Sequence, residues 1–397
     1  MSVWKEYSLG EVCRRLSSGK NITARDIHDV GQYVVFGGNG VRGYTTKSNF
    51  VGECAIIGRQ GAYCGNVRYF HGEAWMSEHA VVAEAKPEHD SRFLACLLST
   101  MNLGSLSGQA AQPGLSVKVL AEQKVFLPDG PTQRLVSEVV GSIDDHIENN
   151  RRRVEVLEEM ARTIYREWFV KFRYPGHEDV PMVDSALGPI PEGWEVAPAS
   201  TLITVNPRIK LDKSVEHPFI TMSDLDEGSL SCRPSDVRTG GSGSKFELGD
   251  TLFARITPCL QNGKTGLVQS LAEGEVGMGS TEFIVLRGKL VGSAYTYCLA
   301  RDEHFRGHAI SSMSGASGRQ RVRNECFDSY LIAAPPGGLS DEFEATAEPL
   351  LLQAKVLFDE SERLGALRDA LLPKLVTGEI DVSSLDLDAV VVEQVAS

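Results

Sequence analysis

The chain of 397 residues repeats its own pattern at a distance of 207 positions. Identical pairs include Ser107 with Ser314, Pro128 with Pro335, Glu155 with Glu362, and Leu157 with Leu364. No gap is needed from residue 107 to about residue 170; upstream the offset drifts, as in 52–60 (GECAIIGRQ) against 249–256 (GDTLFARI). The chain is therefore expected to fold as two similar halves, about residues 1–175 and 190–380.

Both halves place the same kinds of segment in the same order. Short β-rich runs with glycine-rich turns precede a helix-like stretch (91–103 and 291–305), a Ser-Gly turn, a strand that ends at proline, and a long helix. We therefore predict an α+β fold with two blocks of mixed α/β structure, each with a twisted sheet. The expected boundaries are 1–130 (first block), 131–175 (first long helix), 176–189 (linker), 190–338 (second block), 339–380 (second long helix) and 381–397 (acidic tail).

The long helices carry the clearest periodicity. From Val136 to Trp168 apolar residues recur every four and three positions, interrupted only by Asn150, which predicts a heptad seam. The second helix repeats the pattern from Phe343 to Leu371, and Pro349 predicts a kink or a fresh helix start. A lone helix of about 40 residues is roughly 60 Å long and cannot bury such a seam. We expect an antiparallel pair related by a pseudo-twofold axis; the alternative is that each helix folds back on its own block. Asn150 either fixes the register or is an accommodated surface residue.

Composition limits the class of protein. With 42% hydrophobic and 23% charged residues, the chain is typical of a soluble globular protein, and it has no apolar run of membrane-spanning length. Most of its net charge of −13 falls in residues 339–397, which carry 13 acidic and 4 basic side chains. Each block is nearly neutral and can present a basic face to a polyanion. Eight scattered cysteines without a CxxC pair, and a start without a signal peptide, predict reduced thiols in the cytoplasm.

Signatures of catalytic and cofactor sites are missing or incomplete. Gly38, Gly40 and Gly43 match GxGxxG, but the residues that follow do not resemble the helix that a dinucleotide site needs. The sequence has no HExxH, no HxE with a CxxC partner and no GxSxG. We therefore expect no metal, nucleotide or hydrolase site in this chain.

Three segments in the right order carry a resemblance to a known family. They are 157–178 (LEEMARTIYREWFVKFRYPGHE), 187–196 (LGPIPEGWEV) and 367–382 (LRDALLPKLVTGEIDV). Together they resemble the DNA-specificity (S) subunit of type I restriction–modification enzymes. Residues 257–266 and 279–287 are similar to segments of that family's target recognition domains, so the resemblance covers about residues 4–382.

The resemblance implies a non-catalytic subunit of a DNA methyltransferase and restriction endonuclease. Each block would be a target recognition domain for one half of a split site in double-stranded DNA, and the helices would form an antiparallel spacer. The implied partners are two modification subunits, which bind S-adenosylmethionine and typically methylate adenine N6, and restriction (motor-nuclease) subunits that use ATP and Mg²⁺. No cofactor is then bound by this chain, and no membrane is involved. The acidic tail has no counterpart in the repeat and is assigned no role.

Candidate DNA-contacting residues are cations, amides and aromatics in the predicted loops. In the first block they are Arg42, Tyr44, Lys47, Arg59, Gln60, Tyr63, Gln109, Gln112 and Lys118. In the second block they are Arg208, Lys210, Arg255, Lys264, Arg319, Gln320, Arg321 and Arg323. The strongest cluster is 315–323 (GASGRQRVR), for which a solvated loop or salt bridges to local acids is the alternative.

The aromatic end of the first long helix is a second candidate surface. It offers Tyr165, Trp168, Phe169 and Phe172 either as core or as a docking surface for a modification subunit. Two other functions stay open at this point. One is a coiled-coil scaffold that binds only protein, and the other is a self-contained DNA methyltransferase or nuclease.

Overall fold

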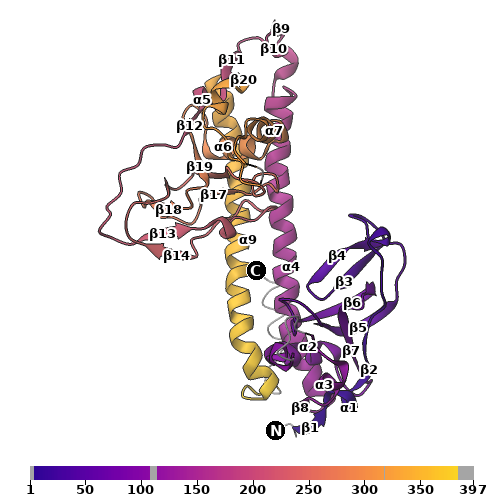
Figure 1. The fold of residues 1–397 in the computed structure, drawn as a ribbon. Helices are drawn as coiled ribbons and strands as arrows, with labels where there is room; N and C mark the ends of the chain where they lie inside the picture. Colours follow the sequence, from indigo (N-terminus) through magenta and orange to yellow (C-terminus); the bar gives the residue numbers. More distant parts are fainter. Residues whose placement is uncertain (1–3, 108–113, 317, 383–397) are drawn as a thin grey trace. The chain divides into compact units, whose positions relative to one another are not determined.

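The computed structural model describes residues 4–107, 114–316 and 318–382. The chain divides into two units: Met1–His146 together with Arg363–Ser397 (unit 1), and Ile147–Glu362 (unit 2). Helices α4 (Gly130–Tyr165) and α9 (Gly337–Thr377) each run without interruption through the boundary between the units (Figure 1). No helix within the three described ranges is long and apolar enough to span a bilayer.

Unit 1 is built around a six-stranded sheet with the order β2-β7-β5-β6-β3-β4. The strands are β2 (Cys13–Ser18), β3 (Tyr33–Gly37), β4 (Gly40–Thr45), β5 (Phe50–Gly58), β6 (Val67–Met76) and β7 (Ala80–Ala85). All neighbours are antiparallel except β3 and β6, which are parallel. Strand β7 is buried along its whole length, and helix α2 (Ser91–Thr100) packs on β5 and β6.

A small β-pair closes unit 1 and leads into the long helix. Strand β1 (Lys5–Ser8) precedes α1 (Leu9–Val12) and pairs antiparallel with β8 (Lys124–Leu127), which follows α3 (Val117–Ala121). Because β8 is followed directly by α4, this pair fixes where the helix leaves the block.

Unit 2 repeats this connectivity in four strands of its main sheet and in the small β-pair. The order β12-β19-β16-β17 corresponds to β2-β7-β5-β6, and the pair β11-β20 corresponds to β1-β8. The strands are β11 (Glu195–Pro198), β12 (Ile203–Val205), β16 (Thr251–Ala254), β17 (Thr265–Leu267), β19 (Phe283–Gly288) and β20 (Leu331–Ala334). The helices are α5 (Ala199–Leu202), α6 (Ser293–Arg301), α7 (Glu303–Ser311) and α8 (Cys326–Ser329). The internal repeat predicted from the sequence is therefore confirmed as a repeated topology.

The second block departs from the first where β6 would continue. A separate sheet, β14-β13-β18-β15, takes its place, with β13 parallel to β18 as β3 is to β6. Its strands are β13 (His217–Ile220), β14 (Asp236–Arg238), β15 (Ser244–Phe246) and β18 (Gly277–Gly279). A hairpin of β9 (Met182–Ser185) and β10 (Gly188–Pro191) lies within the predicted linker and just after it.

The two long helices pair in both units. In unit 1, Val136 and Val140 of α4 share a core with Leu375 and Val376 of α9. In unit 2, the later part of α4 shares a core with the early part of α9, including Phe343. The beginning of each helix thus meets the end of the other, which confirms the antiparallel pair and shows that folding back on one block alone was wrong.

The structure decides the two alternatives that the sequence left open for Pro349 and Asn150. Helix α9 continues unbroken through Pro349, so the alternative of a fresh helix start is wrong. Pro349 and Ala345, whose carbonyl would otherwise accept a bond from residue 349, are both exposed, so water can solvate that carbonyl. Asn150 is fully buried, and its Nδ2 donates to Glu360 Oε2 at 3.0 Å, so the surface alternative is wrong.

Candidate nucleic-acid interface

A cationic cavity of about 440 Å³ lies in unit 2 beside the end of β12. Arg208, Lys245 and Arg255 line it together with Asn206 and Phe283. Among the described residues no carboxylate lines this cavity. Such a concave group of cations suits phosphate oxygens and the acceptor edges of bases. Sequence reasoning missed Lys245, although it directly follows the glycine-rich turn 240–244.

Arg255 lines this cavity and also binds the basic loop 314–323. The loop therefore lies close to the cavity. Its ends are joined by backbone hydrogen bonds between Ser314 and Arg321, of 3.1 and 3.0 Å. Arg321 places its guanidinium on Glu282, with Nε 2.9 Å from Oε2, and this partner lowers the pKa of Glu282. The salt-bridge alternative is therefore confirmed for Arg321.

The remaining side chains of the loop differ in burial and in whether they form hydrogen bonds within the domain. Arg323 donates from Nε to Ser314 Oγ at 3.1 Å, and Gln320 is half-buried. Arg319 is exposed, and its guanidinium bonds to none of the residues that the structure describes. Arg319 is thus the arginine of this loop best placed to reach a ligand.

Other candidates in unit 2 are dispersed. Arg208 and Lys210 are exposed after β12, whereas Lys264 is half-buried and donates from Nζ to the Met222 carbonyl at 3.0 Å. Arg255 is half-buried and donates from Nη2 to the Val322 carbonyl at 2.8 Å. Lys264 and Arg255 therefore donate hydrogen bonds to backbone carbonyls of their own domain.

In unit 1 the β3–β4 hairpin carries three of the candidates. Arg42 and Tyr44 lie on β4 and Lys47 follows it, all exposed. The glycine run between these strands forms a hairpin turn, as β4 follows instead of a helix. This confirms that the GxGxxG match is not a dinucleotide loop.

A second group of unit 1 candidates surrounds the end of β5. Arg59 is half-buried and donates to the Leu115 carbonyl and to Ser18 Oγ, at 3.1 and 3.2 Å. Gln60, Tyr63 and Lys118 are exposed. Gln109 and Gln112 lie outside the described residues.

The aromatic residues at the end of α4 belong to the core of unit 2. Tyr165 and Phe169 are buried, whereas Trp168 and Phe172 are half-buried. Phe169 contacts Tyr295 and Phe343, with ring centroids 4.8 and 5.1 Å apart. Burial also raises the pKa of Tyr165 well above its ordinary value. These rings join α4 to α6 and α9.

The long helices also expose apolar side chains that sequence reasoning did not single out as a surface. Met160 of α4 is 46% exposed in unit 2, and Leu367 of α9 is 49% exposed in unit 1. The two are partners in the 207-residue repeat, so the same helix position is exposed and apolar in each half. The signal was present in the heptad pattern, because Met160 lies off the seam.

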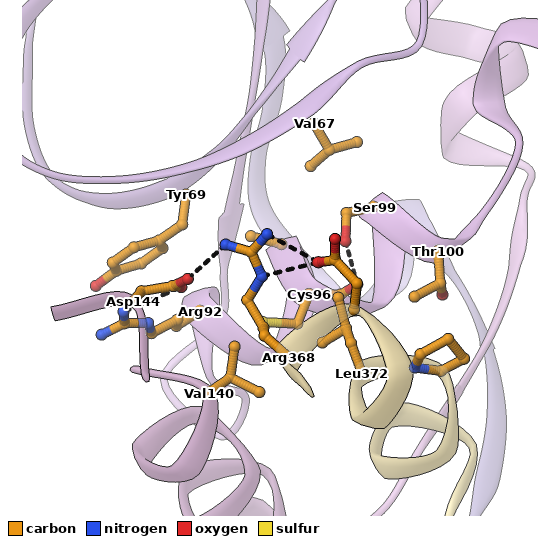
Figure 2. Close-up of a pocket in the computed structure, with 13 residues that line it drawn as sticks. Val67, Tyr69, Arg92, Cys96, Ser99, Thr100, Val140, Asp144, Arg368 and Leu372 are labelled. Atoms are coloured by element: carbon orange, nitrogen blue, oxygen red, sulfur yellow. Dashed lines mark hydrogen bonds and ion pairs between the residues drawn. The ribbon is translucent and has the colours of Figure 1, made fainter. Parts of the chain in front are cut away.

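A pocket in unit 1 has a different character (Figure 2). It has a volume of about 600 Å³ and is lined by residues of α2, α4 and α9. Asp144 of α4 accepts from Arg368 of α9 at 2.9 Å and lies 3.5 Å from Arg92 of α2. Arg92 also lies over the ring of Tyr69, 5.0 Å from its centroid. Because acidic and basic groups neutralise each other here, we regard the pocket as a structural junction.

Comparison with known proteins shows what this chain is similar to. The family described as the type I restriction modification DNA specificity domain matches residues 1–159. The specificity subunit of the type I restriction enzyme EcoprrI from Escherichia coli is 37% identical over 144 residues, which cover 35% of this chain and 36% of that subunit. The chain thus aligns with about a third of that relative's length.

Two further relatives cover more of the chain. The MjaIX specificity subunit of Methanocaldococcus jannaschii is 25% identical over 74% of this chain and 70% of its own length. The crystal structure of a type I restriction-modification S subunit from M. genitalium has the same fold, with a TM-score of 0.60 and 13% identity over 94% of this chain and 96% of that one. The chain is thus similar to the specificity (S) subunits of type I restriction–modification systems, over residues 1–159 by the family description and over most of its length by the MjaIX subunit and the shared fold.

Proposed function

We propose that this chain is the DNA-recognition subunit of a type I restriction–modification complex. Residues 1–130 and 190–338 would be target recognition domains, each specific for one half of a bipartite, asymmetric DNA site. The observation that carries the proposal is the repetition of one domain topology, each copy continuing into a long helix of an antiparallel pair. A duplicated domain with different loop residues suits a site whose two halves differ in sequence.

The proposed contact surface lies on the loops of each domain. In the second domain it comprises the cavity with Arg208, Lys245 and the loop that carries Arg319. In the first domain it comprises the β3–β4 hairpin with Arg42 and Lys47. Cations supply phosphate contacts and hence affinity, while amides and guanidinium forks on base edges supply specificity. A basic local surface on a chain of net charge −13 requires the charge to be unevenly distributed, as it is here.

We further propose that the helix pair sets the distance between the half-sites and carries the partner subunits. The repeated exposed position of Met160 and Leu367 supports docking of two like subunits, one on each half. These would be modification subunits, with restriction subunits joining the complex. In that arrangement S-adenosylmethionine, ATP and Mg²⁺ are bound by the partners in the cytoplasm, and this chain performs no chemistry.

The test is reconstitution with modification subunits of a type I system. Methylated positions in random DNA would be mapped with the complex, with the modification subunits alone and with this chain alone. We expect methylation only with the complex, at a split site with a fixed gap. Methyl transfer by the chain alone would identify a self-contained methyltransferase instead.

DNA affinity distinguishes the remaining alternative. We expect binding that weakens steeply with salt, as counterion release requires. If the complex has no salt-dependent DNA affinity, the chain is a protein-binding scaffold.

A further inference from the structure

Arg255, at the end of strand β16, makes two hydrogen bonds to the basic loop and one to the turn before β19. Its backbone N–H donates to the Glu282 carbonyl at 2.9 Å, and its carbonyl accepts from Val322 N at 2.9 Å. Its side chain turns back, and Nη2 donates to the Val322 carbonyl at 2.8 Å. The backbone carbonyl and the side chain of Arg255 thus bind both the N–H and the carbonyl of Val322.

Unit 1 contains the same arrangement around Arg59 at the end of β5. Its N–H donates to the His79 carbonyl and its carbonyl accepts from Leu115 N, both at 2.9 Å. Its Nε donates to the Leu115 carbonyl at 3.1 Å. Leu115 and Val322 are partners in the 207-residue repeat. The two domains therefore share an arginine that makes two hydrogen bonds to an equivalent residue, Leu115 or Val322, and a third to the residue just before β7 or β19.

Arg255 lines the cationic cavity, but two of its three guanidinium nitrogens are bonded to Val322 or buried. Arg255 Nε is buried, and Arg59 uses Nη1 on Ser18 Oγ at 3.2 Å. Loop 314–323 is meanwhile anchored through Val322, through the Gln320 carbonyl, which accepts from Thr257 N at 3.1 Å, and through Arg321 on Glu282. Arg255 therefore lies where the strand end, the turn before β19 and the loop converge.

We infer that Arg255 is a positioning residue that fixes the recognition loop of its domain through Val322 and determines half-site specificity without contacting DNA, and that Arg59 acts likewise through Leu115 in the first domain. The inference rests on the proposed function. Its physical basis is preorganisation: a loop held in one conformation loses less entropy on binding and presents its base-contacting groups in one geometry. An arginine whose guanidinium group already donates to a backbone carbonyl contributes little to phosphate binding.

The test compares two matched variants of the complete chain in the assembled complex, Arg255→Met and Arg59→Met. Methionine is unbranched and apolar like the arginine stem, and it lacks the donor and the charge. We expect Arg255→Met to broaden base preference only in the half-site of the second domain, and Arg59→Met only in the other. The slope of log affinity against log salt should not change in either variant. A decrease of about 0.9 in that slope, the value for one phosphate contact, would overturn the inference for that arginine.

A measurement without DNA decides the structural part independently. The Val322 amide donates to the backbone carbonyl of residue 255, a bond that Arg255→Met keeps, while the Val322 carbonyl loses the bond from the arginine side chain. Loss of that one bond eases local opening, so exchange at the Val322 amide should be about tenfold faster in Arg255→Met and unchanged in Arg59→Met. Arg255→Lys, which retains a donor on a long stem, should restore both the protection and the base preference. Exchange at Val322 equal to wild type in Arg255→Met would overturn the inference. Absence of any base preference in the wild-type complex would overturn the proposed function, while the exchange result would still stand.

Discussion

Glu158 offers the sharpest test of how α4 is joined to the second domain. It lies on α4 within unit 2 and is 2% exposed. Its carboxylate accepts from the Tyr297 hydroxyl at 2.6 Å and from Leu230 N at 2.9 Å. It also lies 3.4 Å from Nη2 of Arg301, whose side chain is 7% exposed. A buried charge with this many partners holds α4, α6 and the loop before β14 together.

Truncation of Glu158 to alanine should destabilise unit 2 by about 4 kcal/mol. Removing one partner of a buried ion pair costs about 3–5 kcal/mol, because the other charge stays buried without compensation. Here Arg301 retains the carbonyls of Glu227 and Gly263, at 3.2 and 2.9 Å, which favours the lower part of that range. The Tyr297 hydroxyl and Leu230 N–H lose their acceptor as well, at about 1–3 kcal/mol each, and these losses overlap with the first.

The matched control is the neighbouring residue. Glu159 is 50% exposed in its side chain and pairs with Arg166 on the surface, so Glu159→Ala should cost under about 1 kcal/mol. Urea unfolding of the complete chain would be followed by hydrogen exchange of amides in each unit, since a chain with two units need not unfold in one step. The reasoning is refuted if the two alanine variants differ by less than about 1 kcal/mol in unit 2.

Three further predictions concern other parts of the chain. Burial raises the pKa of Glu344 above its ordinary value of 4.5, although it accepts from Tyr295 N at 2.8 Å. Its stabilising contribution is therefore present at acidic pH and lost as pH rises through the raised pKa, so Glu344→Gln should flatten the decline in unfolding free energy towards neutral pH. Asn150→Leu should stabilise the chain by about 1 kcal/mol in urea unfolding, because the Asn150 Oδ1 is buried without a hydrogen-bond partner among the described residues; destabilisation would contradict this. Four residues inserted after His146 and four after Glu362 lengthen each helix by about 6 Å, and methylation mapping should show a longer gap between unchanged half-sites; altered half-sites would contradict the spacer.

The repeat and the heptad seam made most of the architecture predictable. Hydrophobic periodicity depends on burial of a helix face, so positions such as Val136 and Val154 were identifiable from spacing alone, and both are buried. Strand order was not predictable, because β3 and β6 are parallel neighbours separated by two other strands in sequence. Such pairings depend on tertiary packing, which local pattern does not encode.

The residue types and positions of the candidate site were predictable, but the hydrogen-bond partners of its arginines were not. Arg59, Arg255 and Arg321 were chosen as cations near turns, which is correct as to position. Their guanidinium groups nevertheless bind a carbonyl or a carboxylate of their own domain. Whether an arginine in a loop is free depends on acceptors that are distant in sequence, such as Leu115 for Arg59. Long-range partners of this kind are invisible in a single sequence.

The repeat preserves much of the topology but not the chemistry of the helix seam. Asp144 and Arg368 form an ion pair in unit 1, while their repeat partners, Leu351 and Ala161, are buried and apolar in unit 2. In a pair of two first helices, Asp144 would occupy the position opposite Ala161, and in a pair of two second helices Arg368 would occupy the position opposite Leu351. A carboxylate or guanidinium facing an apolar side chain at a partly buried seam loses its partner and its hydration. The divergence of these positions therefore favours pairing between the two different helices of one chain, which is the arrangement that joins two different domains.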